Sequence, residues 1–369
     1  MLILLMLCTA VAAIVCGILL KFGAGSARSY GAMAPQRFHA GHIPRLGGVA
    51  MLAACCVGWA WIVCAERYFS VANQIRLEFT EALAWYLVAF IAAGAGIAED
   101  LTQEVSPRWR LVLSALAGVV GCWLLGLRVP SLDINLLAPL WNASPWPGIA
   151  LAAFAVAGLP HAFNLIDGYN GLAGIVALIC SLALAYVCLA VGDRQLAGVL
   201  VVLAGATAGF LLWNYPRGLI FAGDGGAYLW GVVIAIVSIQ LVQRHHHMVS
   251  PWFPILLLIY PVWETFFSIY RKLARGQSPG LADALHFHQL IYRRIVRGVF
   301  HDDEARRMLM RNNRTSPYLW GFTVLTVLPA VMFWRSTPIL MVFTALFVAT
   351  YVFAYVSIIC FKVPHWLRR

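Results

Sequence analysis

Charged residues are scarce in this chain of 369 residues: 11% are Asp, Glu, Lys or Arg, whereas 62% are hydrophobic, and the mean hydropathy is +0.81. Soluble globular proteins carry about 25% charged residues. So little charge excludes a cytosolic enzyme, a disordered chain and a nucleic-acid-binding arm. Because a spanning helix needs about 20 mostly apolar residues, the composition predicts an all-α polytopic integral membrane protein.

Two further features are missing. The first apolar run has no cation before Lys21, so it lacks the basic region that opens a secretory signal, and we interpret residues 2–21 as a retained first span. None of the nine cysteines forms a Cys-x-x-Cys pair with histidine partners. They lie inside or at the margins of apolar runs, where free Cys behaves as a small hydrophobe. We therefore expect no redox or metal role for them.

Apolar runs predict about eleven transmembrane helices. Their approximate ranges are 2–21, 46–65, 82–98, 111–127, 148–166, 171–192, 196–213, 227–242, 253–270, 318–334 and 338–361. The one long polar interval, 271–317, is expected to be a loop. Since no internal repeat or linker is evident, we expect a single transmembrane domain over residues 1–369.

Lysine and arginine counts predict the orientation. If loop 21–45 is cytoplasmic and the sides alternate, the cytoplasmic segments hold 20 of these residues and the other side holds 6, which accounts for all 26. Lys and Arg accumulate in cytoplasmic loops, so we expect the N-terminus outside and the C-terminus in the cytoplasm. The net charge of +11 then reflects topology and contact with an anionic bilayer rather than a nucleic-acid partner.

Five polar clusters fall on the predicted cytoplasmic side, each at or near a span end. They are Arg37-Phe-His39 with Pro44-Arg45-Leu-Gly47-Gly48; Glu99-Asp100; Asn164-Leu-Ile-Asp167-Gly168-Tyr169-Asn170-Gly171; Asn214-Tyr-Pro216 with Phe221-Ala-Gly223-Asp224-Gly225-Gly226; and Asp283-Ala-Leu-His286-Phe-His288. Singly, each is also typical of a hydrated helix end or a glycine turn. Mg²⁺ takes one or two carboxylates plus substrate phosphates, and Arg and His supply positive charge for phosphate oxygens. Together the clusters predict a site for a metal–diphosphate ligand at the cytoplasmic membrane surface.

Two other polar features stand apart from these clusters. Arg244-His245-His246-His247 resembles a metal or phosphate site, but the topology places it outside, and we interpret it as a plain interfacial loop. Glu264 is the only acid well inside a predicted span. An intramembrane acid is functional or paired by default, and Arg271 or Lys272 are the expected partners.

From about Arg37 to Leu290, in motif order, the sequence resembles the polyprenyl-phosphate N-acetylhexosamine-1-phosphate transferases (glycosyltransferase family 4), and within them the undecaprenyl-phosphate N-acetylglucosamine-1-phosphate transferase branch. The resemblance implies ten or eleven spans, with the active site on cytoplasmic loops. It also implies Mg²⁺, with Mn²⁺ as the alternative ion.

The resemblance assigns roles residue by residue. It gives catalytic roles to Glu99, Asp100, Asp167, His286 and His288, substrate binding to Arg45, Asn164, Asn170, Asn214 and Phe221, and the metal to Asp224. In it, Phe221 stacks on uracil, Asn214 lies in the nucleoside pocket, and the two histidines hold the diphosphate. Asp100 lies near the acceptor phosphate. This chain departs from the family at four positions, where Glu99, Asn170 and Glu264 replace Asp and Gln289 replaces His.

The implied reaction transfers an N-acetylhexosamine-1-phosphate from a UDP-N-acetyl sugar to undecaprenyl phosphate, giving undecaprenyl-diphosphate sugar and UMP. Such a step in a bacterial inner membrane would initiate a surface polysaccharide such as O-antigen. A transporter is the alternative, although its polar groups would lie near the bilayer midplane, often in repeated halves. A non-catalytic scaffold, a catalytically altered family member and a homodimer also stay open.

Overall fold

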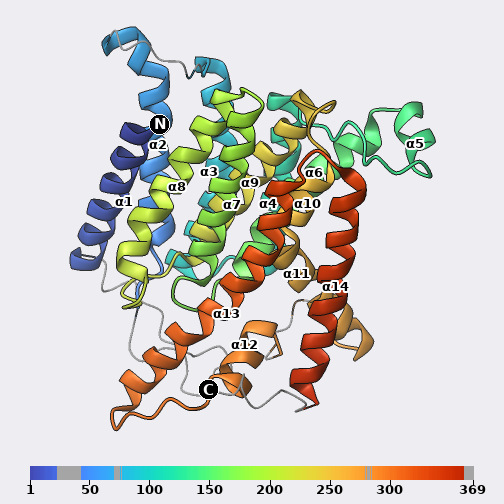
Figure 1. Cartoon of the computed structure of the whole chain (residues 1–369). Helices are drawn as coiled ribbons and strands as arrows, with labels where there is room; N and C mark the ends of the chain where they lie inside the picture. Colours follow the sequence, from blue (N-terminus) through green and yellow to red (C-terminus); the bar gives the residue numbers. More distant parts are fainter. Residues whose placement is uncertain are drawn as a thin grey trace.

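The computed structural model describes residues 1–22, 43–69, 75, 77–278, 280, 283 and 285–360, with the side chains of 66–69 left aside. Arg37-Phe-His39 therefore lies outside the described residues. Within these ranges every regular element is a helix (Figure 1), as expected. The elements are α1 (Leu2–Phe22), α2 (Gly47–Phe69), α3 (Phe79–Thr102), α4 (Pro107–Leu125), α5 (Ala138–Ala143), α6 (Trp146–Ile166), α7 (Leu172–Ala190), α8 (Arg194–Asn214), α9 (Gly223–Arg244), α10 (Trp252–Leu257), α11 (Ile259–Ala274), α12 (Phe287–Leu290), the π-helical turn η2 (Ile291–Ile295), α13 (Glu304–Met332) and α14 (Thr337–Ile359).

The chain is a multi-pass membrane protein. Counting only the described residues, 10 helices are long and apolar enough to cross a bilayer. They are α1, α2, α3, α4, α6, α7, α8, α9, α13 and α14. All nine cysteines, each within the described ranges, are free thiols; five of them are buried, and Cys360 is exposed.

The run expected to form a span at 253–270 is broken in two. α10 ends at Leu257 and α11 begins at Ile259. Pro261 explains the break, because it has no N–H to donate to the carbonyl of Leu257 four residues earlier. The span expected at 253–270 is therefore a pair of consecutive short helices, α10 and α11, neither of which is long enough to cross a bilayer alone.

The interval 271–317 is not the loop that its polarity indicated. α11 continues to Ala274, and α13 begins at Glu304, well before its apolar portion. Asp303 caps α13, since its Oδ1 accepts the backbone N–H of Ala305 at 2.8 Å, a stabilising arrangement at a helix start. The polar first half of α13 was not predicted as helix because an apolar run marks only the apolar part of a helix.

α9 forms the centre of the bundle. Every residue of its apolar window is buried, and α2, α3, α6 and α8 pack against it. A helix that is apolar all round is expected in such a position. Its first turn carries Asp224, so the most enclosed helix of the protein presents a carboxylate at one end of the bundle.

Helix α1 begins, and helix α14 ends, on opposite sides of the bundle. Figure 1 shows α1 beginning towards the end away from α12, and α14 finishing at the end where α12 lies. Polar side chains from several helix ends meet on the α12 side, as the contacts below describe.

Candidate active site

Asp224 stands at the centre of the polar site. Its side chain is 6% exposed, and its Oδ1 accepts a hydrogen bond from the Asn164 amide at 2.8 Å. Arg45 lies 3.5 Å from the same oxygen, and Arg110 donates to Oδ2. The carboxylate at the start of α9 is thus held by residues that precede α2, open α4 and end α6.

Asp100, at the end of α3, fixes the first turn of α9. Its two carboxylate oxygens accept the backbone N–H groups of Asp224 and Gly225, at 3.1 and 2.9 Å. Arg45 lies 3.7 Å away. A negative charge at a helix N-terminus satisfies otherwise unpaired N–H groups and interacts favourably with the helix dipole. Asp100 therefore positions Asp224.

The α3–α9 contact requires glycine on α3. A Cβ added at Gly96 would lie 2.4 Å from the carbonyl carbon of Asp224, much closer than any side chain tolerates. Gly94, two residues earlier, has open space at the same position. The backbone of α3 therefore approaches the metal-ligand candidate directly at Gly96.

The segment 44–48 holds the residues just before Asp224 through backbone hydrogen bonds. The N–H groups of Gly47 and Gly48 donate to the carbonyls of Phe221 and Ala222, both at 2.9 Å, and the N–H of Phe221 donates to Pro44 at 2.9 Å. These backbone pairs bring Arg45 beside Asp224. They also place Phe221, half-buried, at the edge of the site.

Asp167 directly follows α6, one turn beyond Asn164, and is half-buried. Burial raises the pKa of Asp167 to about 7; Arg45 opposes the shift and Asp224 adds to it. A carboxyl group with such a pKa exchanges its proton near neutral pH. Such a group is suited to proton transfer at neutral pH.

His286 caps the start of α12 and His288 lies in its first turn, beside the turn that follows α6. A Cβ at Gly168 would sit 3.9 Å from His288 Nε2. The His286 and His288 rings stack with centroids 5.4 Å apart, and Tyr169 packs edge-on against His288. Burial lowers the pKa of His288 to about 3, so this imidazole stays neutral and can offer hydrogen bonds but no positive charge.

The side chains of Asn214 and Asn170 form hydrogen bonds between segments that are distant in sequence. Asn214 accepts the N–H of Gly171 at 2.7 Å and donates to the carbonyl of Ile220 at 2.8 Å, which joins the turns after α6 and α8. Asn170 is fully buried and donates to Asn313 Oδ1 at 2.9 Å, so its side chain faces α13. Substrate binding by these two residues stays a prediction.

Glu99 is buried beside Asp100 and interacts electrostatically with Arg110 and Tyr228. The site therefore brings together Arg45, Glu99, Asp100, Asn164, Asp167 and Asp224, with His286 and His288 beside them.

The sequence did not predict a role for Arg110, nor for the hydrogen-bonded residues His161, Ser114 and Tyr228. His161, inside α6, contacts Ser114 Oγ at 2.8 Å and the Tyr228 hydroxyl at 3.2 Å. Two signals were available. Arg110 opens a span on the predicted cytoplasmic side, and a histidine within an apolar run is functional or paired by default.

The expected partners of Glu264 were wrong. Its carboxylate contacts His286 and Tyr351, whereas Arg271 pairs with Asp283 at 3.1 Å. Glu264 thus supports the histidine motif instead of closing an ion pair along its own helix.

The Arg244–His247 loop forms a separate cluster. Arg244 pairs with Glu81 at 3.0 Å and with Asp193 at 3.3 Å, and His245 lies 3.3 Å from the same Asp193 oxygen. None of the carboxylates of the candidate site takes part in these contacts. The loop joins the start of α3 to the turn between α7 and α8.

The oxygen donors around Asp224 fit a hard divalent cation. Asp100, Asn164 and Asp167 accompany it, and carboxylate and amide oxygens are the ligand types that Mg²⁺ prefers. Among the described residues, no group of three or more His, Cys, Asp or Glu side chains forms a ready-made metal cluster.

Comparison with known proteins shows which proteins this chain is similar to. Residues 82–242 match the family model described as "Glycosyl transferase family 4". A Bacillus subtilis (strain 168) protein named probable undecaprenyl-phosphate N-acetylglucosaminyl 1-phosphate transferase is 27% identical over 69% of this chain and 66% of its own length. Undecaprenyl-phosphate alpha-N-acetylglucosaminyl 1-phosphate transferases are similar: that of Yersinia pestis is 27% identical over 70% of this chain and 68% of its own, and that of Escherichia coli (strain K12) 26% over 70% and 67%.

The matches span about two thirds of the length of these relatives. The matched family segment runs from α3 to α9 and contains Asp100, Asn164 and Asp224, the residues whose side chains meet at the centre of the site. Over this segment the chain is similar to glycosyl transferase family 4.

Proposed function

We propose that the protein transfers an N-acetylhexosamine-1-phosphate from a UDP-N-acetyl sugar to undecaprenyl phosphate, releasing UMP. The observation that carries the proposal is the Asp224 carboxylate, buried at the start of the central helix and held by Asp100, Asn164, Arg45 and Arg110. The names of the similar proteins describe transfer of this class.

Two arginines give the site its affinity for a diphosphate. Arg45 and Arg110 both lie against Asp224. Guanidinium groups form strong charge-assisted hydrogen bonds with phosphate oxygens. When the sugar nucleotide binds, its phosphates would share these cations with the carboxylate. His288, which is neutral, would add a hydrogen bond through its ring.

Asp224 would hold Mg²⁺ or Mn²⁺, with Asp100 behind it fixing the helix turn. When bound, the ion neutralises negative charge on the diphosphate of the donor and on the departing UMP. Asp100 has both oxygens engaged with the backbone of α9, so we assign it a positioning role. Asp224 instead pairs with the side chains of Asn164, Arg45 and Arg110, which can turn to the phosphates of a bound donor, so we assign Asp224 to the ligand.

The chemistry follows from the substrates. An oxygen of the lipid phosphate would attack the β-phosphorus of the UDP-sugar in line, and the bond from that phosphorus to the bridging oxygen would break. The electron pair would leave with UMP. Such transfers depend on positioning and charge neutralisation. A phosphate monoester has a second pKa of about 6, so Asp167, with a pKa of about 7, would take only a residual proton.

The membrane setting suits a lipid acceptor. The lipid tail would lie along the apolar helices while its phosphate reaches the polar end of the bundle. We propose a bacterial inner membrane, with the N-terminus outside and the site on the cytoplasmic side, because 20 of 26 Lys and Arg residues follow that orientation. A surface polysaccharide such as O-antigen is the proposed pathway.

Release of UMP tests the function. Purified protein, undecaprenyl phosphate and Mg²⁺ would be incubated with a panel of UDP-N-acetyl sugars. We expect UMP release with at least one donor, dependent on the lipid and abolished by EDTA. Asp224→Asn should abolish it, whereas Asp302→Asn, an equal change at an exposed site, should not.

Absence of UMP with every donor would contradict the function. Glu99→Asp, which restores the family residue, would then distinguish a catalytically altered member from a protein of another class: recovered UMP release would mark the former.

A further inference from the structure

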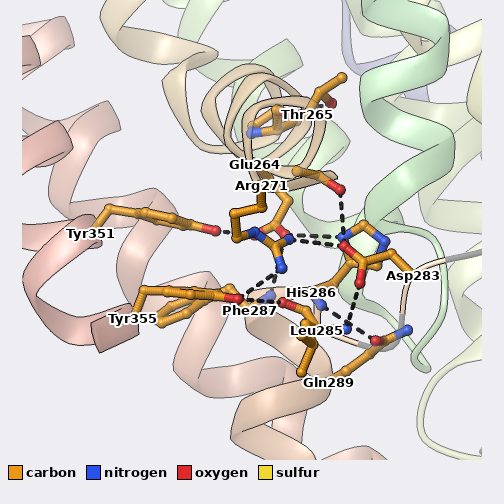
Figure 2. Close-up of polar contacts among 12 residues, drawn as sticks. Glu264, Thr265, Arg271, Asp283, Leu285, His286, Phe287, Gln289, Tyr351 and Tyr355 are labelled. Carbon is orange, nitrogen blue, oxygen red and sulfur yellow. Dashed lines mark hydrogen bonds and ion pairs between the residues drawn. The ribbon is translucent and has the colours of Figure 1, made fainter. Parts of the chain in front are cut away.

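Glu264 is a fully buried carboxylate that receives donors from three directions. Its Oε1 lies 3.2 Å from His286 Nδ1 and accepts the backbone N–H of Phe287 at 3.2 Å. Its Oε2 accepts the hydroxyl of Tyr351 at 2.5 Å. Figure 2 shows Glu264 above the histidine segment, with Tyr351 reaching in from α14. A buried charge is stable only when it is paired and hydrogen-bonded, and these donors meet that need.

The ring of Tyr351 is locked in place. The side chain is fully buried, and its ring lies 4.9 Å from that of Phe287 and 5.5 Å from that of Phe267, measured between centroids. The hydroxyl is thus held at Glu264 by packing from both α11 and α12. A phenylalanine would keep that packing and lose only the hydrogen bond.

A second tyrosine on α14 fixes the chain just before His286. Tyr355 accepts a hydrogen bond from Arg271 at 2.7 Å and donates to the carbonyl of Leu285 at 3.2 Å. Asp283 pairs with Arg271 at 3.1 Å and accepts the N–H of Leu285 at 3.0 Å. Figure 2 shows these contacts below Glu264. The segment that leads into the histidine motif is therefore held at two levels by α14.

These contacts define the state of His286. A ring nitrogen bonded to a carboxylate carries the proton, which sets the tautomer and the orientation of the other nitrogen. With Nδ1 turned to Glu264, Nε2 is the remaining nitrogen for a ligand. When the ring is neutral, Nε2 accepts a hydrogen bond from the ligand; when the ring is charged, Nε2 donates one.

We propose that Tyr351 is a positioning residue of the active site, acting through Glu264 to hold His286 in the orientation and protonation that transfer needs. The proposal rests on the function proposed above. It extends the functional unit to α14, which lies outside residues 82–242 matched by the family model.

The remaining charged or titratable groups that face the Glu264–His286 pair come from three elements and the segment before α12. They are Tyr260 and Arg271 on α11, Asp283 before α12, His288 on α12 and Tyr355 on α14. The Tyr351→Phe variant tested below leaves all of these groups in place. Removing the Tyr351 hydroxyl leaves the carboxylate less stabilised, so the pair binds a proton more tightly, on Glu264 or on His286.

Tyr351→Phe tests this, with Tyr270→Phe as the matched control. Tyr270 lies on α11 and is 66% exposed. We expect Tyr351→Phe to lower kcat for UMP release about tenfold with the donor KM within twofold. The limb of the pH profile that belongs to the pair should move to higher pH by about half a unit. Tyr270→Phe should change neither.

A double-mutant cycle separates positioning from packing. In a Glu264→Gln background, Tyr351→Phe should cost little more, because its hydroxyl acts through the carboxylate. Multiplicative losses in kcat, with an unmoved pH profile, would overturn the proposal and assign Tyr351 to packing alone.

A pH titration of the ¹⁵N-histidine resonances measures the apparent pKa of the Glu264–His286 pair without any enzymatic turnover. His286→Asn identifies the resonances by their disappearance. Tyr351→Phe should raise the apparent pKa of the pair, and an unchanged value would overturn the proposal. If the unmodified protein releases no UMP from any donor, the transferase function fails, and this titration still decides whether Tyr351 controls His286.

Discussion

The carboxylate of Asp100 accepts the backbone N–H of Asp224 at 3.1 Å, so the last turn of α3 fixes the first turn of α9. The two acids lie 124 residues apart in sequence. In the proposed function Asp100 positions this turn and Asp224 faces the ligand.

Gly96→Ala should disrupt the site, whereas Gly94→Ala should not. The new methyl group at position 96 would lie 2.4 Å from the carbonyl carbon of Asp224, and at position 94 it meets open space. Overpacking costs about 1–3 kcal/mol, and it would displace Asp224. We expect UMP release to fall at least about tenfold with Gly96→Ala. Equal activity of the two variants would contradict the α3–α9 geometry.

Arg110→Gln should lower kcat/KM for UMP release. Removing one partner of a close charge pair costs about 2 kcal/mol or more, roughly 30-fold in rate. Arg108, two residues earlier, is exposed, and Arg108→Gln is the matched control. If both variants retain full kcat/KM, Arg110 takes no part in substrate binding or transfer.

Asn170→Asp should destabilise the protein, although Asp is the usual family residue there. The Asn170 amide donates to Asn313 Oδ1 at 2.9 Å and to the carbonyl of Pro216 at 3.4 Å, and a carboxylate cannot donate to either. Leaving buried polar groups unpaired costs about 1–3 kcal/mol. We expect Asn170→Asp to melt at a lower temperature in detergent than the unchanged protein, with Glu99→Asp measured as a comparison. An unchanged or higher melting temperature would show that these hydrogen bonds do not stabilise the fold.

Asp167 should make stability depend on pH. Its pKa of about 7 in the folded protein lies above the ordinary 3.8. Between these values the folded state binds a proton that the unfolded chain has lost, so the free energy of unfolding falls as pH rises through this window and stays low above it. Asp167→Asn removes this dependence. Its melting temperature relative to the unchanged protein should therefore rise between about pH 5 and pH 8, and a constant difference would contradict the assigned pKa.

Much of the fold could be predicted from the sequence, because apolar runs report directly on lipid-facing and buried helices. The convergence of Asp100, Asn164 and Asp224 also followed, since alternating spans bring their helix ends to one side. The helix break before Ile259 was not predicted, although Pro261, which causes it, is visible in the sequence. The apolarity of a segment tells which solvent it prefers, and it does not change when one backbone N–H is missing.

The side-chain partners were the least predictable part of the site. Arg271 lies two turns from Glu264 on one helix and was therefore the expected partner. Tertiary packing instead brings Tyr351 from α14, 87 residues away. Arg110 was likewise one of two arginines in a short polar stretch, and only the packing of α4 against α3 and α6 selects it. Local spacing cannot encode such contacts.

In the proposed reaction the β-phosphate of the donor moves to the lipid together with its sugar. The direct measurement uses a UDP-N-acetyl sugar carrying ³²P in the β-phosphate, incubated with purified protein, undecaprenyl phosphate and Mg²⁺ and then extracted with an organic solvent. We expect lipid-dependent label in the organic phase, equimolar with UMP and absent with Asp224→Asn. Label that stays in the aqueous phase as UDP, while the sugar alone reaches the lipid, would contradict this reaction.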